Sequence, residues 1–300
     1  MTMLRPRLLA PLALAILPAL CAAAGAQQGP GPLFPEPFRV AHRLIQEDGD
    51  GSRFVGEPVM DTYGGSWIVS ERPDGSRLIV DLARRELSEV RPDKGVYWTV
   101  SFDRFAELQK QMRDAQGLAP EKKETGKAAA HPAAELVVTE VAADAGRRSG
   151  AASLADRPGV RRLRVSRKDA GKPLLDVWVD PSVRLTPAAL GAVASLETVL
   201  AGPDAGGDGD VPPARSLAAA RSQAGGAIAI RTVRPLAAPG SQVEDEATKV
   251  ERLDRFPSEL AEIPEGLRRV PHPLESVVRF LEEDAKRNAA MAGRTTEQKP

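Results

Sequence analysis

The chain has 300 residues, 41 basic and 41 acidic side chains, and a single cysteine, Cys21. Balanced charge offers no broad electrostatic surface for nucleic acid, so a nucleic-acid-binding function is excluded. One cysteine cannot form a disulfide within the chain, so the stability of the fold has to come from buried apolar side chains.

Residues 1–26 have the composition of a secretory signal peptide. Two arginines precede an apolar run, Leu8–Leu20, which two prolines interrupt and which is too short to span a bilayer as a stable helix. Small residues then favour cleavage before Gln27. Lipidation of Cys21 is the alternative, but the residues just before it are not those of a lipoprotein signal. We therefore expect a periplasmic or secreted chain without a retained transmembrane helix or a cysteine.

Residues 27–37 are rich in Gly and Pro, and we predict a flexible leader there. From Phe38 to Ile45 apolar and polar residues alternate, which predicts a half-buried strand. Four more strands are expected at residues 65–71, 77–82, 86–90 and 96–101. Because short turns containing Pro-Asp join most of them, neighbouring strands are predicted to be antiparallel and to form a meander.

An amphipathic helix is predicted to follow the meander. Ser101 is suited to cap it, since its hydroxyl can accept a hydrogen bond from the first helical turn. Phe102, Phe105, Leu108 and Met112 fall on one helical stripe. This stripe has to cover an apolar surface, and the meander is the expected partner.

The second half of the chain repeats this order of strands and helices. Thr186 and Pro187 mark the start of a second helix, and a last helix is expected at residues 274–287. Mobile loops are predicted at 119–134 and 201–216, and a disordered tail at 288–300. Further strands are expected at ELVVTEV, VRRLRVS, PLLDVWVD, GAIAIRTV and DEATKVERL.

These elements predict one α+β domain over residues 38–287. We expect a large curved antiparallel β-sheet, a half-barrel, covered on one face by two or three helices.

Motifs for catalysis and metal binding are missing from the sequence. The three histidines, His42, His131 and His272, are dispersed, and neither HExxH nor GxSxG nor a phosphate-binding glycine loop occurs. A catalytic triad could still assemble in space. We nevertheless predict a protein that is not an enzyme and that has no metal and no cofactor.

Three stretches allow both a functional and an ordinary interpretation. The acidic, Gly-rich stretches Glu47–Gly51 and Asp204–Asp210 could offer oxygens to calcium, but Asp-Gly pairs are also common in turns, which we favour. The basic stretch Arg161–Lys168 could bind a phosphate or a lipid head group. A strand with one face in water, or a charged edge strand that discourages aggregation, is the commoner explanation, and we favour it.

Apolar residues of the predicted strands could line a binding cleft for a hydrophobic ligand. The alternative is that they fill the core between sheet and helices, where large aromatic side chains contribute most burial. Trp178 is singled out because its face of the strand also carries Asp176 and Asp180. The candidate lining residues are Trp67, Val96, Trp98, Val100, Leu175, Val177 and Trp178.

Three blocks of the sequence resemble a family of exported bacterial proteins of unassigned function. The blocks are RLIVDLARRELSEVRPDKGVYWTVSFDRF, PLLDVWVDPSVRLTPAAL and TKVERLDRFPSELAEIPEGLRRVP. That family is similar in architecture to the lipoprotein-carrier and lipoprotein-localisation (LolA-like) half-barrel. This chain departs from the pattern at Ala261, Glu262 and Leu267, where the family has aromatic rings that help to close the core.

The resemblance implies a non-enzymatic module whose cleft holds an acyl chain or a lipidated partner. The alternative is a cell-envelope module with a self-filled core, which binds other proteins through loops or edge strands. An unfilled apolar cavity would favour the first function, and a fully packed interface between sheet and helices would favour the second.

Overall fold

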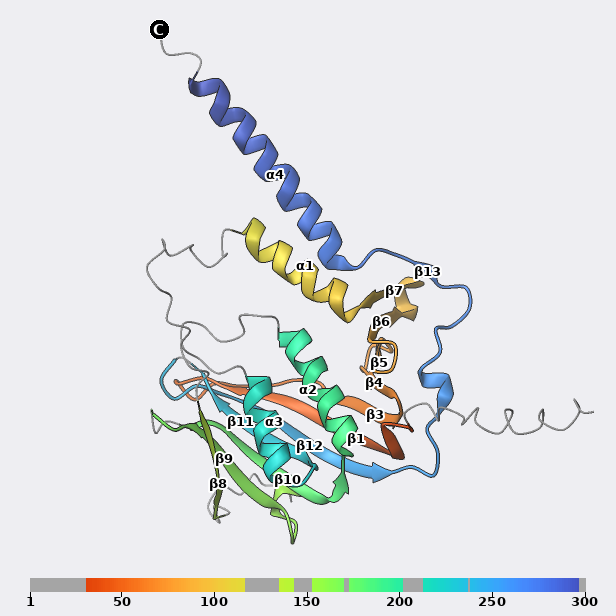
Figure 1. Ribbon diagram of the computed structural model, residues 1–300, viewed down its shortest axis with the longest axis vertical. Helices are drawn as coiled ribbons and strands as arrows, with labels where there is room; N and C mark the ends of the chain where they lie inside the picture. Colours follow the sequence, from red (N-terminus) through yellow and green to blue (C-terminus); the bar gives the residue numbers. More distant parts are fainter. Residues whose placement is uncertain are drawn as a thin grey trace, which may run out of the picture. The chain divides into compact units, whose positions relative to one another are not determined.

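A long first strand, β1 (Phe34–Glu47), lies inside one continuous β-sheet in the computed structural model (Figure 1). The structure describes residues 31–116, 135–142, 153–169, 173–201, 213–236 and 238–296, which, apart from Gly31, belong to one compact unit, Pro32–Pro300. The strand predicted from Phe38 is present, but it begins at Phe34, within the expected flexible leader. Phe34 is only 3% exposed and packs edge-on against Phe38, so a buried ring holds this segment in the sheet.

The sheet has 13 strands and is open, so the predicted α+β architecture is confirmed. The other strands are β2 (Arg53–Val55), β3 (Val59–Gly65), β4 (Trp67–Glu71), β5 (Arg77–Asp81), β6 (Glu86–Arg91), β7 (Val96–Ser101), β8 (Leu136–Val141), β9 (Arg161–Arg167), β10 (Pro173–Arg184), β11 (Ala227–Pro235), β12 (Gln242–Arg252) and β13 (Arg268–Arg269). Their order is β13-β7-β6-β5-β4-β3-β1-β12-β11-β10-β9-β8, and β2 pairs with β1. In the part of the chain that the structure describes, β13 pairs with β7 in parallel and the other strand pairs are antiparallel, so the sheet is mixed rather than purely antiparallel.

Four helices of the described residues pack on this sheet. They are α1 (Phe102–Ala115), α2 (Pro187–Ala201), α3 (Pro213–Gln223) and α4 (Pro273–Thr296). Helices α1 and α2 contribute to the main core, which they share with strands from both halves of the sheet. Helix α3 covers β8–β11 through a second apolar cluster, and α4 lies along α1.

Both predicted helix caps are confirmed. The Ser101 hydroxyl accepts a hydrogen bond from the backbone N–H of Arg104 at 3.2 Å, and the Thr186 hydroxyl accepts one from that of Ala189 at 3.1 Å. Phe102 and Leu108 of the predicted α1 stripe are fully buried, and Phe105 and Met112 pack against the main core. Amphipathic spacing and capping residues therefore placed this helix correctly.

Two further predicted boundaries differ from the structure, those of α3 and α4. Helix α3 begins at Pro213, inside the loop expected at 201–216, and α4 continues to Thr296, inside the expected tail. Helix α3 buries Ala220, and its face toward the sheet is made largely of small residues, so its apolar pattern is weak in the sequence. The predicted loop at 119–134 lies outside the described residues, as do 202–212 and 297–300.

An irregular segment with one short 3-10 helix (Ser258–Leu260), residues 256–267, covers the other face of the meander, and we call it the strap. Phe256 and Leu260 of the strap pack against Val69, Ile79 and Val90, which are all buried. The guanidinium of Arg77 on β5 donates to the carbonyls of Glu259 and Leu260, both at 3.1 Å, and to that of Glu262 at 3.2 Å. The meander is thus covered on both faces, by helices on one and by the strap on the other.

Candidate functional site

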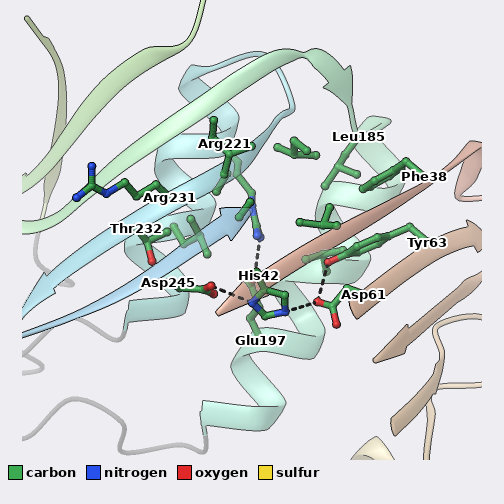
Figure 2. Close-up of a pocket in the computed structure, with 17 residues that line it drawn as sticks. Phe38, His42, Asp61, Tyr63, Leu185, Glu197, Arg221, Arg231, Thr232 and Asp245 are labelled. Atoms are coloured by element: carbon green, nitrogen blue, oxygen red, sulfur yellow. Dashed lines mark hydrogen bonds and ion pairs between the residues drawn. The ribbon is translucent and has the colours of Figure 1, made fainter. Parts of the chain in front are cut away.

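Two adjoining cavities lie between the sheet and helices α2 and α3. The charged cavity has a volume of about 250 Å³ and is lined by residues of β1, β3, β11, β12 and both helices (Figure 2). The apolar cavity has a volume of about 330 Å³. Glu197, Leu217, Thr232 and Asp245 belong to the walls of both, so we treat the two cavities as one cleft.

Strand register brings the polar residues of the charged cavity together. Side chains in a strand alternate between faces, so Phe38, Val40 and His42 of β1 point to the same side. In β3, Tyr63 pairs with Phe38 and Asp61 with Val40, and paired residues share a face. Asp61 therefore lies diagonally next to His42, on the face that the helices cover.

His42 lies between two carboxylates contributed by different strands. Its Nδ1 is 2.9 Å from Oδ1 of Asp245, and its Nε2 is 3.2 Å from Oδ2 of Asp61 (Figure 2). Burial alone would lower the pKa of His42, but the hydrogen bonds and charges of Asp245 and Asp61 outweigh it and raise the pKa to about 10. His42 is accordingly an imidazolium at neutral pH, with both ring N–H groups directed at carboxylates.

Tyr63 extends this cluster toward the core. Its hydroxyl donates to Oδ2 of Asp61 at 3.4 Å, and its ring stacks on Phe38 with centroids 4.5 Å apart. Burial, followed by the charge of Asp61, raises the pKa of Tyr63 well above its usual value. The phenol is therefore neutral and acts as a donor.

The helices contribute an ion pair of their own. Arg221 of α3 donates through Nη1 to Oε1 of Glu197 on α2, and both side chains are largely buried. Five buried atoms of residues that line the cavity have no hydrogen-bond partner in the part of the chain that the structure describes. They are His42 Nε2 and Arg231 Nε, which lie in ion pairs with Asp61 and Glu244, and Asp61 Oδ1, Glu197 Oε2 and Arg221 Nε. Buried polar atoms are nearly always hydrogen-bonded in native proteins, so water or a ligand has to complete these bonds.

The apolar cavity has walls made mainly of aliphatic side chains. They come from β1, β10, β12 and the two helices, and they are Leu44, Leu175, Leu200, Pro213, Ala214, Leu217 and Val243. Leu175, one of the lining residues proposed from the sequence, does line this cavity. Val177, two residues further along β10, is buried beneath α3. The cleft thus has an aliphatic end and a charged end.

The other residues proposed from the sequence lie elsewhere. Trp98 and Val100 are buried in the main core, where the indole N–H of Trp98 donates to Glu89 at 2.8 Å. Val96 is partly buried at the start of β7. Trp67 lies on the face of the strap, where it lines a separate cavity of about 250 Å³.

Trp178 lies between two cations rather than in the cleft. The guanidinium carbons of Arg162 and Arg231 lie 4.9 and 4.7 Å from its ring centroid. Arg231 also pairs with Glu244 at 2.8 Å, and Figure 2 shows its guanidinium pointing away from the charged cavity. The Trp178 indole is therefore held by cation–π contacts within the protein itself.

The acidic stretch Glu47–Gly51 and the basic stretch Arg161–Lys168 form a turn and a paired strand, as we favoured from the sequence. Asp50 accepts from the backbone N–H of Ser52 at 2.8 Å, which makes a turn between β1 and β2. In β9, Arg162 and Arg164 pair with Asp176 of β10 at 2.6 and 2.8 Å, so the strand partner compensates these charges. The stretch Asp204–Asp210 lies outside the described residues.

Sequence reasoning missed most of the charged end. Strand β3, which carries Asp61 and Tyr63, was not predicted, and neither was α3, which carries Arg221. The alternation of Asp61 and Tyr63 with Met60 and Thr62 was the available signal for β3. The pairing of β1 with both β3 and β12 has no comparable signal in the sequence.

The described residues contain neither a cluster suited to a metal ion nor a helix suited to crossing a membrane. No group of three or more His, Cys, Asp or Glu side chains among them is arranged to hold a metal ion. Among the same residues, no helix has the length and apolarity needed to cross a membrane.

Comparisons with known proteins leave the family open. No family model matches the chain, and no curated protein matches it either. Among solved structures, an uncharacterized conserved protein from Thermus thermophilus has a TM-score of 0.36 at 7% identity, over 79% of this chain and 90% of that one. PNGF-II has a TM-score of 0.34 at 11% identity, over 82% of this chain, which spans 33% of the length of PNGF-II. A LolA superfamily protein from Nitrosomonas europaea has a TM-score of 0.28 at 10% identity, over 76% of this chain and 90% of that one.

Proposed function

We propose that the protein is an exported, non-enzymatic binding protein that holds a hydrophobic ligand in the cleft between the sheet and helices α2 and α3. The observation that supports this function is the cleft itself, which joins cavities of about 330 and 250 Å³. Cavities of several hundred Å³ with mostly apolar walls and a few polar groups are typical of small-molecule sites. Binding there would be driven by removal of apolar ligand surface from water.

Native mass spectrometry of the protein purified from its own host tests this function directly. A copurified apolar molecule is the expected result. In parallel, displacement of the fluorescent probe N-phenyl-1-naphthylamine by decanol reports binding to the emptied protein. Ligand that binds only the folded state also raises the midpoint of thermal unfolding. A protein that carries no lipid, does not bind the probe and is not stabilised by decanol would refute the proposed function.

Leu217 offers a variant that tests the location. Its side chain lines both cavities, so Leu217→Trp fills the junction between them. Phe280→Trp is the matched control, because Phe280 is 62% exposed on α4 and lines neither cavity. We expect L217W to weaken probe binding at least tenfold and F280W to leave it unchanged. Circular dichroism checks that both variants fold.

A second candidate function, protein binding in the cell envelope, is favoured by exposed apolar residues on α4. Val277 is 41% exposed and Phe280 is 62% exposed, and large apolar side chains at a surface often belong to interfaces. This function predicts that Phe280→Ser abolishes site-specific crosslinking to an envelope protein and that apolar ligands do not stabilise the chain. The two functions therefore give opposite results in the thermal assay.

A further inference from the structure

The two ends of the cleft differ in chemistry in a way that restricts the ligand. Leu175, Leu200 and Val243 contribute aliphatic walls at one end. Seven ionisable side chains line the other, namely His42, Asp61, Tyr63, Glu197, Arg221, Arg231 and Asp245. A purely apolar ligand is complementary only to the aliphatic end of the cleft. A ligand that fills both needs a polar head.

The cations at the charged end are already compensated. His42 is bound by two carboxylates, Asp61 and Asp245, and Arg221 is bound by Glu197. Three carboxylates therefore face two cations, which leaves one negative charge in excess. Arg231 does not alter this balance, because it pairs with Glu244 and points away (Figure 2).

The remaining hydrogen-bonding capacity points to the same kind of head group. Asp61 Oδ1 and Glu197 Oε2 are buried acceptors without a hydrogen-bond partner among the described residues. The donors in the same position, His42 Nε2, Arg221 Nε and Arg231 Nε, all belong to cations that are paired with carboxylates. An anionic head would bring further negative charge to three carboxylates, while the nearby cations are engaged. A protonated amine instead donates up to three hydrogen bonds and neutralises the excess charge.

On the basis of the proposed function, we infer that the ligand is an amine-bearing amphiphile, with its apolar chain between Leu175 and Leu200 and its ammonium group at Asp61 and Glu197. Arg234 lines the apolar cavity but not the charged one. A carboxylate head held there is the competing arrangement, and the experiment distinguishes the two.

The test compares the affinities of decylamine, decanol and decanoate at neutral pH, measured by displacement of N-phenyl-1-naphthylamine at concentrations below micelle formation. We expect decylamine to bind at least tenfold more tightly than either of the others. Propylamine carries the head without the chain and is expected to bind at least a hundredfold more weakly than decylamine. If propylamine bound as tightly as decylamine, the inference of an amphiphilic ligand would be refuted, because the amine head alone would account for the affinity.

Substitutions at the charged end test the position of the head. Glu197→Gln and Asp61→Asn should each reduce the preference for decylamine over decanol about tenfold. Glu251→Gln is the matched control, since Glu251 lies on β12 like Asp245 but lines neither cavity. If D61N fails to fold, because it also removes a partner of His42, E197Q alone decides the outcome.

The possible outcomes separate this inference from the proposed function. If decylamine, decanol and decanoate all fail to bind, the proposed function fails and the inference fails with it. If all three bind with equal affinity, or decanoate binds best, the cleft holds apolar ligands and only the inferred amine is refuted. A preference for decylamine that E197Q leaves intact would likewise overturn the assignment of the head group.

Discussion

The double ion pair of His42 makes a quantitative prediction about stability and pH. The folded-state pKa of about 10 lies above the ordinary value of 6.5, so between these values the folded protein holds a proton that the unfolded chain has released. The stabilisation by His42 is therefore fully present below pH 6.5 and is lost as the pH rises through about 10. A pKa difference of one corresponds to about 1.36 kcal/mol, so the loss amounts to at most about 5 kcal/mol across this window.

The assay is urea unfolding of the wild type and of His42→Gln at intervals of pH between these values. Other groups titrate in both proteins, so the difference in their free energies of unfolding isolates His42. This difference should fall by about 1.4 kcal/mol per pH unit in the middle of the window, where the histidine has lost its proton in the unfolded chain but not in the folded protein. NMR titration of the imidazole Cε1–H should show no protonation change near neutral pH. A midpoint close to 6.5, or a difference that does not vary with pH, would show that the two carboxylates do not hold the proton.

Further predictions concern the strap, two glycines and the second buried histidine. Arg77→Ala removes three charge-assisted bonds to the strap and should lower the free energy of unfolding by about 1–3 kcal/mol, with faster amide exchange in residues 256–267. Gly64→Ala should cost about 1–3 kcal/mol, since its Cβ would lie 2.5 Å from Phe256, whereas Gly191→Ala in α2 meets no atom within 4 Å and should stabilise by about 0.5–1 kcal/mol. Burial lowers the pKa of His272 despite the charges of Glu275 and Glu89, so this residue should destabilise the fold progressively as the pH falls below 6.5, and His272→Asn should remove that pH dependence.

Three results would contradict the predictions for Arg77, Gly64 and His272. Unchanged exchange in the strap of R77A would mean that apolar packing alone holds the segment. A stable G64A would require the Phe256 ring to move without cost. A pH profile of H272N identical to that of the wild type would assign the acid sensitivity to other groups. Chemical unfolding followed by circular dichroism measures all of these stabilities.

The candidate site was only partly accessible from the sequence. His42 lay in a correctly predicted strand, but nothing in its local pattern distinguishes a strand histidine held by two carboxylates from one in water. Its partners are 19 residues away in β3 and 203 residues away in β12. Glu197 was within a predicted helix, while Arg221 lay on a helix whose Ala-rich face gave little periodic signal.

The same limit applies to the aromatic residues. The sequence marked all three tryptophans as large strand residues, but it could not assign them to faces of the sheet that pack differently. Trp98 lies in the core, Trp67 beside the strap and Trp178 between two arginines. The strap itself has no periodicity, because Phe256 and Leu260 dock individually on a surface that exists only once the meander has formed.

Local chemistry determined the elements of this protein. Two-residue alternation produced strands, Ser101 and Thr186 began helices, and short turns made neighbours antiparallel, since each of these depends on residues close together in the chain. Only the tertiary structure decided which strands pair with β1, which helices cover these strands and hence which charged side chains meet in the cleft. Such pairings follow from the packing of whole faces against one another, a free energy to which residues hundreds of positions apart contribute jointly.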